Sequence, residues 1–273
     1  QAEAEERIRC YRRAIELDPT FAFSHYNLGQ SLRAKGDIQG AIAEYRKALE
    51  LHPEYTFCHL ELGRTLARQG DSQGAEKHLR RVIEINPDFW AAYPPLCEVL
   101  LAAGDATAVA DVSRQCVRQF PAWSAGYDRL ILALNRKGRH TEAVRVYHEA
   151  VPRIDPKWPE TDMPRLRFGA ARAAVLAAAG SGEDPPLPAD RAQFRQQALA
   201  WLRADLDAYG KALDAGPPGP RTTSPPVVKV GLTDAGLASV RDPAALAALP
   251  DAERDAWKQF WDDVRRLRAA AAK

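Results

Sequence analysis

Histidine and cysteine are two residue types of this 273-residue sequence that could bind a metal ion or act as a base or nucleophile. Metal-binding motifs place such residues at short fixed spacings, as in HExxH or paired CxxC segments, and neither spacing occurs here. The six histidines are His25, His52, His59, His78, His140 and His148. We expect them to have packing or surface roles, and we expect neither a metal ion nor a cofactor.

The four cysteines are Cys10, Cys58, Cys97 and Cys116. Because cysteine is among the most buried residue types and no paired spacing is present, buried free thiols are favoured over a disulfide or a metal site. Free thiols fit a reducing compartment. The expected location is therefore the cytoplasm.

Carboxylates and glycine-rich segments are the remaining chemical candidates. Asp262 and Asp263 are neighbours in the chain, so they point in different directions around a helix; Glu183 and Asp184 lie in a connector that we expect to be flexible. The segments GSGEDPP and GPPGP lack the GK[ST] ending of a phosphate loop, and no HRD or DFG motif for phosphoryl transfer is present. We expect no catalytic residue in this chain, which argues against a self-contained hydrolase or metalloenzyme.

Composition narrows the choice of partner. The net charge is only +2 and the chain is 46% hydrophobic and 27% charged, which is ordinary for a soluble domain and gives no basic surface for nucleic acid. No apolar run reaches the roughly 20 residues that span a bilayer. The start, QAEAEERIRC, lacks the shape of a signal peptide. We expect a piece of a longer protein or a processed product.

A period of 34 residues organises the first half of the chain. Four residue series keep this register: Pro19, Pro53, Pro87 and Pro121; Gly36, Gly70, Gly104 and Gly138; Leu28, Leu62, Leu96 and Leu130; and Leu32, Leu66, Leu100 and Leu134. A repeat of this length is typical of a helix-turn-helix unit copied several times. His25 and His59 occupy equivalent positions of it. The sequence therefore predicts an all-α solenoid.

Each repeated position has a physical role. Gly29 and Gly63 fall inside a helix, where glycine costs roughly 1 kcal/mol relative to alanine; this is tolerable where a second helix must approach closely. The glycines of the second series fall where the first helix of each unit should end, in a left-handed cap. Asp37, Asp71 and Asp105 follow them and suit the cap of the next helix. Small residues are expected where the paired helices cross: Ala41, Ala75 and Ala143.

Two segments, HYNLGQSLRAKGDIQGAIAEYRKALELHP and HLELGRTLARQGDSQGAEKHLRRVIEINP, resemble the tetratricopeptide repeat. The likeness weakens in the third unit, where Cys97 and Val109 replace the glycine and the small alanine, and in the fourth, where Ile131 replaces the glycine. We expect the first helix of the third unit to start late or to kink at Pro94–Pro95.

The resemblance implies the following division of the chain. We expect a partial repeat with only its second helix in 1–21 and four whole units in 22–157, namely 22–55, 56–89, 90–123 and 124–157. A divergent closing helical pair is expected in 158–215, a proline-rich irregular linker in 216–250, and a helix in 251–273 that packs back on the closing pair. Within the linker, the apolar segment Val227–Val230 suits an extended conformation.

The tail carries a second resemblance. The motifs WLRADL, VRDPAAL and FWDDV are similar to the C-terminal ends of planctomycete serine/threonine protein kinases that carry tetratricopeptide arrays. This resemblance covers about 165–209 and 238–264, and the chain departs from it over RTTSPPVVKVGLTDAG (221–236). It implies an alternative function, the regulatory C-terminal portion of a kinase whose catalytic domain lies upstream.

In tetratricopeptide arrays the first helix of each unit lines a concave groove that holds another polypeptide. The residues that this pattern places in the groove are Phe23, Tyr26, Asn27, Gln30, Arg33, Phe57, Leu60, Glu61, Arg64, Arg68, Glu98 and Leu101 from the first three units, and Asp128, Arg129, Leu132, Asn135 and Arg136 from the fourth. Arginine and amide side chains suit carboxylates and peptide backbone, and aromatic rings suit apolar anchors.

We therefore expect a non-catalytic scaffold that binds a protein or peptide segment, with no nucleic acid, membrane insertion or metal. The alternative is a solvated surface that serves only as a spacer. Glu98 stands where a clamp for two carboxylates would need a basic residue, which disfavours chaperone binding.

Overall fold

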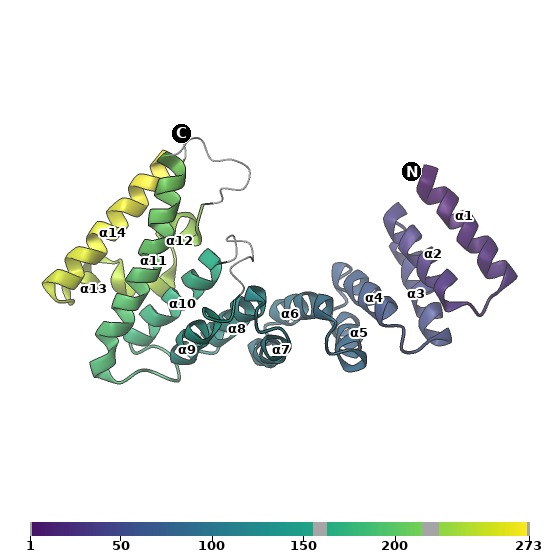
Figure 1. The fold of residues 1–273 in the computed structure, drawn as a ribbon, viewed down its shortest axis with the longest axis horizontal. Helices are drawn as coiled ribbons and strands as arrows, with labels where there is room; N and C mark the ends of the chain where they lie inside the picture. The colour runs from purple at the N-terminus through teal and green to yellow at the C-terminus, as the bar shows by residue number, and fades with distance from the viewer. Residues whose placement is uncertain (1, 155–162, 215–223, 272–273) are drawn as a thin grey trace. The chain divides into compact units, whose positions relative to one another are not determined.

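The structure is a computed structural model that describes residues 2–154, 163–214 and 224–271 (Figure 1). Helices and turns make up these ranges, and no β-strand occurs in them. The predicted all-α repeat fold is confirmed. No helix of the described ranges is both long and apolar enough to cross a membrane.

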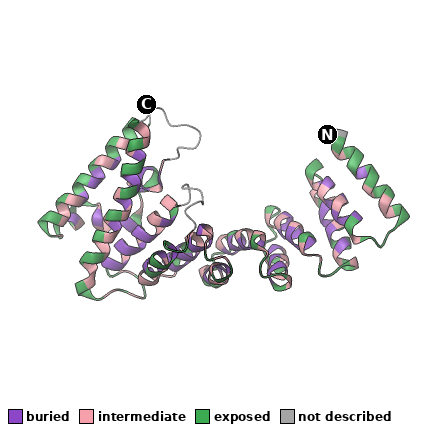
Figure 2. Cartoon of the chain, in the orientation of Figure 1, coloured by how far each residue is buried: buried purple, intermediate pink, exposed green. Residues whose placement is uncertain are grey.

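The chain forms two compact units, Gln1–Val112 and Ser113–Lys273. The helices that begin in the first unit are α1 (Ala2–Leu17), α2 (Ala22–Lys35), α3 (Ile38–Leu51), α4 (Thr56–Arg68), α5 (Ser72–Ile85), the short 3-10 helix η1 (Trp90–Ala92), α6 (Tyr93–Ala102) and α7 (Ala106–Gln119), which contains the boundary between the units. Consecutive helices from α1 to α6 pack on one another. Most helices are buried along one side and exposed along the other (Figure 2).

The turns inside the repeats are made as the sequence predicts. Gly36, Gly70, Gly104 and Gly138 all have positive φ angles, between 69° and 92°, which glycine adopts without steric cost. Asp37 and Asp71 then accept hydrogen bonds from the backbone N–H of Gly40 and Gly74, at 2.9 Å in both cases. These bonds satisfy N–H groups that the first turn of a helix leaves unpaired.

The glycines inside α2 and α4 allow close helix approach. A Cβ atom on Gly29 would lie 2.7 Å from Cε1 of Tyr45, and one on Gly63 would lie 2.8 Å from Cγ of Leu79. Tyr45 and Leu79 are fully buried. The space that a side chain on each glycine would need is therefore filled by a large core residue from the second helix of the same unit.

The third unit starts its first helix late. Residues Trp90–Ala92 form η1, and α6 begins only at Tyr93 with a proline in its first turn. Proline is tolerated there because the first N–H groups of a helix have no partner within it. The predicted effect of Pro94–Pro95 is confirmed.

The second unit holds the rest of the chain. Its further helices are α8 (Ser124–Arg136), α9 (His140–Ala150), α10 (Met163–Ala178), η2 (Pro188–Asp190), α11 (Arg191–Asp214), α12 (Pro226–Val230), η3 (Ala235–Val240), α13 (Pro243–Ala247) and α14 (Asp251–Ala270). The alanine-rich α10 packs against α8, α9, α11 and η3, and its alanines let these neighbours approach closely.

The last helix, α14, packs beside α11 and on α12 (Figure 1). Trp257, Phe260 and Trp261 are almost completely buried on its inner face, and the indole N–H of Trp261 donates to the carbonyl of Val240 at 2.7 Å. Arg203 of α11 pairs with Asp263 of α14 at 2.6 Å. An aromatic stripe and a rim of ion pairs thus attach the end of the chain to this unit.

Two expectations about loops were wrong. Val227–Val230 lies in the helix α12, not in an extended segment, because Val227 and Val228 are buried on one helical face. Asp184 does not lie in a flexible connector: its carboxylate accepts from the N–H of Thr141 at 3.1 Å and of Glu142 at 2.8 Å. It therefore caps α9 from a loop 42 residues further along the chain. Of the proline-rich linker, 216–223 lie outside the described residues.

Candidate functional site

One face of the first unit is made by α2, α4, η1 and α6. Arg33 of α2 pairs with Glu61 of α4 at 3.3 Å, and Arg64 of α4 donates to the carbonyl of Ala91 at 3.2 Å. The predicted residues on it that are not fully buried are Phe23, Asn27, Gln30, Arg33, Phe57, Glu61, Arg64, Arg68, Glu98 and Leu101. We call this surface the first-helix face.

Two phenylalanines stand out on the first-helix face. Phe23 and Phe57 occupy equivalent repeat positions and are 50% and 53% exposed. Phe57 meets Phe89 edge to face, with the ring centroids 5.2 Å apart, and Phe23 lies 6.5 Å from the ring of Tyr26. Each exposed ring is thus supported from one side by a second aromatic ring. The arrangement holds two apolar side chains in place on a surface that otherwise carries charge.

The charged residues of the face form a network that spacing alone did not reveal. The Glu61 carboxylate forms ion pairs with two guanidinium groups, with Arg33 at 3.3 Å and with Arg64 at 3.2 Å. The side chain of Glu61 is 14% exposed. The network therefore fixes both arginines and leaves one positive charge in excess.

Other predicted groove residues are buried or form hydrogen bonds within the fold. Leu60 and Tyr26 are buried; burial, with the charge of Glu61 adding to it, raises the pKa of Tyr26 well above its ordinary value. Gln30 donates to the Tyr26 hydroxyl, and Asn27 donates to the carbonyl of Phe23 at 2.8 Å. These four residues support the face more than they project from it.

A hollow of about 440 Å³ lies between α4 and α6. Its lining residues are Arg64, Ala67 and Arg68 of α4, Ser72 of α5, and Pro94, Pro95, Glu98, Val99 and Ala102 of α6. Three of these residues were predicted for the groove, namely Arg64, Arg68 and Glu98. The others could have been found by aligning the repeats, because Ala67 and Pro95 replace Arg33 and Glu61 of the preceding helices.

The predicted residues of the fourth unit lie on α8, in the second unit of the structure. Asp128 is 3.9 Å from Arg165, Arg129 donates to the carbonyl of Ala125 at 3.4 Å, and Leu132 and Arg136 are exposed. Asn135, in contrast, is buried.

The amide of Asn135 is used in packing. Its nitrogen donates to the carbonyl of Gly169 at 3.0 Å, and its oxygen lies 3.0 Å from Nδ1 of His140. The side chain therefore ties α8 to α10 and has little surface to offer a partner.

Two histidines at equivalent repeat positions contact the backbone of the turn that precedes their helix. Nε2 of His25 faces the carbonyl of Pro19 at 3.2 Å, and Nε2 of His59 faces that of Pro53 at 2.9 Å. In the next two units a tyrosine hydroxyl makes the same contact, from Tyr93 to Pro87 and from Tyr127 to Pro121. Of the packing or surface roles expected for the histidines, His25 and His59 have packing roles. In the described ranges, no three His, Cys, Asp or Glu residues gather as a metal site would require.

The cysteines differ in exposure. Cys58, Cys97 and Cys116 are buried, whereas Cys10 is exposed, so the expected burial is wrong for Cys10. Burial raises the pKa of the Cys58 thiol to about 12, and its sulfur lies 3.2 Å from the carbonyl of Tyr45. A thiol with so high a pKa is not a nucleophile at neutral pH.

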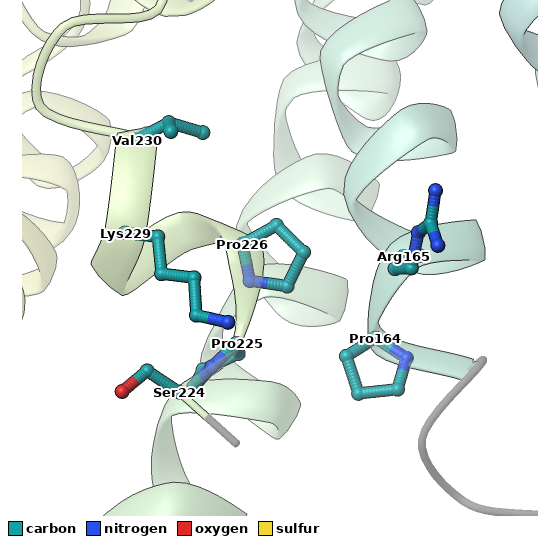
Figure 3. A pocket seen from close by; sticks show the side chains of 7 residues that line it. All are labelled: Pro164, Arg165, Ser224, Pro225, Pro226, Lys229 and Val230. Carbon is teal, nitrogen blue, oxygen red and sulfur yellow. The ribbon is translucent and has the colours of Figure 1, made fainter. Parts of the chain in front are cut away.

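The second unit has a hollow of about 350 Å³ between the start of α10 and α12. It is lined by Pro164, Arg165, Ser224, Pro225, Pro226, Lys229 and Val230, whose side chains are drawn in Figure 3. None of these residues was predicted as a site.

Comparison with known proteins identifies the kind of fold. The sequence pattern of the bacterial transcriptional activator domain matches residues 17–156, about half of the chain. The crystal structure of MamA protein has a TM-score of 0.55 at 20% identity, covering 71% of this chain and 94% of its own. That of YrrB, described as a TPR protein with an unusual peptide-binding site, also has a TM-score of 0.55, at 17% identity, with 75% and 96% covered. No protein of curated function matches this sequence.

Proposed function

This chain belongs to the bacterial transcriptional activator domain family, and from that membership and its tetratricopeptide-type fold we propose that it is a non-catalytic protein-interaction scaffold. The first-helix face of the first unit holds a peptide or a segment of another protein. The residues proposed to contact the bound segment are those defined above as the first-helix face. Asn135, which the repeat pattern assigned to the groove, is not among them because it is buried. We place this activity in the cytoplasm, where the buried thiols stay reduced.

The observation that carries the proposal is the pair Phe23 and Phe57. Both rings are about half exposed at equivalent positions of α2 and α4, the two helices that also carry Arg33 and Arg64, which Glu61 holds in place. Aromatic and arginine side chains supply much of the binding energy of protein interfaces. The exposed half of each ring is apolar surface that a partner can cover. The likeness to YrrB, which is described as having a peptide-binding site, agrees with this proposal.

The test is a pull-down with quantitative mass spectrometry that compares the wild-type chain with a Phe23→Ser, Phe57→Ser double variant. We expect the recovery of specific partners to fall at least tenfold, because two apolar anchors are removed. Leu17→Ser is the matched control, since Leu17 is exposed but lies at the end of α1, outside the face. Equal recovery by the double variant and the control would favour a solvated spacer, provided that circular dichroism shows all three chains to be equally helical.

Two parent proteins are candidates for the scaffold. Family membership favours a transcriptional regulator, whereas the tail motifs WLRADL and FWDDV favour the regulatory portion of a serine/threonine kinase. The coding sequence on either side of the chain distinguishes them. HRD and DFG motifs in the same frame would support the kinase, and a DNA-binding domain would support the regulator.

A further inference from the structure

We propose that the hollow between α4 and α6 is a subsite for the carboxylate side chain of an aspartate or glutamate within the bound segment. This inference rests on the proposed function, because it names the chemistry that one part of the first-helix face recognises.

The repeat provides an internal comparison. Between α2 and α4, Arg33 and Glu61 reach across and form an ion pair at 3.3 Å. Thirty-four residues later the same two positions hold Ala67 and Pro95, whose side chains are too short to bridge the gap. The space that an ion pair fills in one repeat is therefore open in the next, and both replacing residues line it.

The open space is lined with positive charge on one side. Arg64 is held in position by Glu61 at 3.2 Å and by the carbonyl of Ala91 at 3.2 Å, so its guanidinium loses little freedom when a ligand binds. Arg68 is exposed, and no ion pair of Arg68 occurs in the described part of the chain. Against these two cations the lining offers one carboxylate, Glu98.

Apart from Ser72, the remaining walls are apolar. Ala67, Pro95 and Val99 contribute carbon surface, which suits the methylene groups of an aspartate or glutamate side chain. Guanidinium groups bind carboxylates through strong charge-assisted hydrogen bonds. A lysine or arginine of the partner would instead meet Arg64 and Arg68 as like charges. A negatively charged side chain on a short carbon stem therefore fits the hollow best, in the place that Glu61 takes in the preceding repeat.

The experiment uses a library of random 12-residue peptides displayed on phage by their C-terminal ends, so that each carboxylate comes from a side chain. The library is selected on the full chain, and the selected peptides are synthesised with amidated C-termini for titration. We expect aspartate or glutamate to be enriched. Replacing that residue by asparagine or glutamine should weaken binding about tenfold, the effect of one lost hydrogen bond to a charged group.

Two protein variants locate the carboxylate. Ala67→Arg with Pro95→Glu copies the bridge of the preceding repeat and should fill the hollow, and Arg68→Glu reverses an exposed charge at its edge. We expect each to weaken binding at least tenfold. Arg12→Glu is the control, since it changes the net charge equally at an exposed position of α1. If the filled variant fails to fold, Arg68→Glu still decides, because an exposed charge seldom affects folding.

The outcomes separate this inference from the proposed function. Peptides that show no acidic enrichment, or that bind the filled and Arg68→Glu variants as well as the wild type, would overturn the subsite. If those peptides still lose affinity for the Phe23→Ser, Phe57→Ser variant, the face binds peptides and only the subsite is wrong. If no selected peptide distinguishes that variant, the filled variant or Arg68→Glu from the wild type, both the proposed function and the subsite are wrong.

Discussion

The contact between His59 and His78 makes the stability of the second repeat depend on pH. The two Nδ1 atoms lie 2.9 Å apart, so only one of them can carry a proton. Because Nε2 of His59 faces the carbonyl of Pro53 and donates to it, Nδ1 of His59 is the acceptor and Nδ1 of His78 the donor. His59, with one donating and one accepting nitrogen, is therefore neutral in the folded chain.

The charges around the pair oppose its protonation. Burial, then His59, Lys77 and Arg46, lower the pKa of His78 from 6.5 to about 4, while Asp71 acts weakly in the opposite direction. Burial also lowers the pKa of His59, helped by Arg81 and opposed by the Pro53 carbonyl and by Glu84. The environment of both rings thus favours the uncharged form.

A lowered pKa in the folded state means that the unfolded chain binds more protons between pH 6.5 and about pH 4. Stability is therefore fully present above pH 6.5 and falls as the pH falls through this window. The change in pKa corresponds to about 3 kcal/mol. Because part of the His78 ring reaches solvent, which weakens the effect, we expect a loss on the order of 2 kcal/mol.

Urea unfolding followed by circular dichroism at several pH values measures this loss. The matched variant is His78→Glu, which copies the preceding repeat, where Glu44 lies 2.7 Å from Nδ1 of His25. A carboxylate accepts from a protonated His59, so the variant should lose less stability than the wild type between pH 6.5 and pH 4. His52→Glu, at an exposed histidine, controls for the change in composition. Parallel curves for wild type and His78→Glu would refute the reasoning.

Three further substitutions test the packing. Gly29→Ala should lower the free energy of unfolding by about 1–3 kcal/mol through overpacking, because the new Cβ would lie 2.7 Å from Tyr45; urea unfolding measures it, and an unchanged midpoint would contradict the close approach. Asp205→Ala should lower the free energy of unfolding by about 3 kcal/mol, since Asp205 is 4% exposed and pairs with Arg167. Asp207→Ala, at an exposed position of the same helix, should lower it far less. Similar melting temperatures for the two variants would contradict a stabilising role of the Asp205 pair. Asp184→Ala should cost about 1 kcal/mol by removing the cap of α9, visible as faster amide exchange in the first turn of that helix; unchanged exchange there would argue against the cap.

The repeats could be predicted because their signals are local. Gly36 and Asp37 set a turn and a cap within a few residues, and the same pair recurs with the period, so each copy confirms the others. The late start of α6 was also predictable, since Pro94 and Pro95 act through their own backbone.

The rest depends on contacts distant in the sequence. Val227 and Val228 form a helix because the second unit buries one face of it, and Asp184 caps a helix 42 residues earlier in the chain. The period assigned Asn135 to the groove, but α10 covers it. Of the hollow, only the arginines and Glu98 were predicted, because the consequence of Ala67 and Pro95 appears only when neighbouring helices are compared.

Site-specific photocrosslinking tests the central proposal, that the first-helix face holds another polypeptide, most directly. A photoreactive phenylalanine analogue replaces Phe57 in one variant and the exposed Lys47 of α3 in another, and both are irradiated in cells that express the chain. We predict a discrete adduct with a second polypeptide from position 57 and none from position 47. Absence of an adduct at position 57, or equal adducts from both positions, would contradict the proposal.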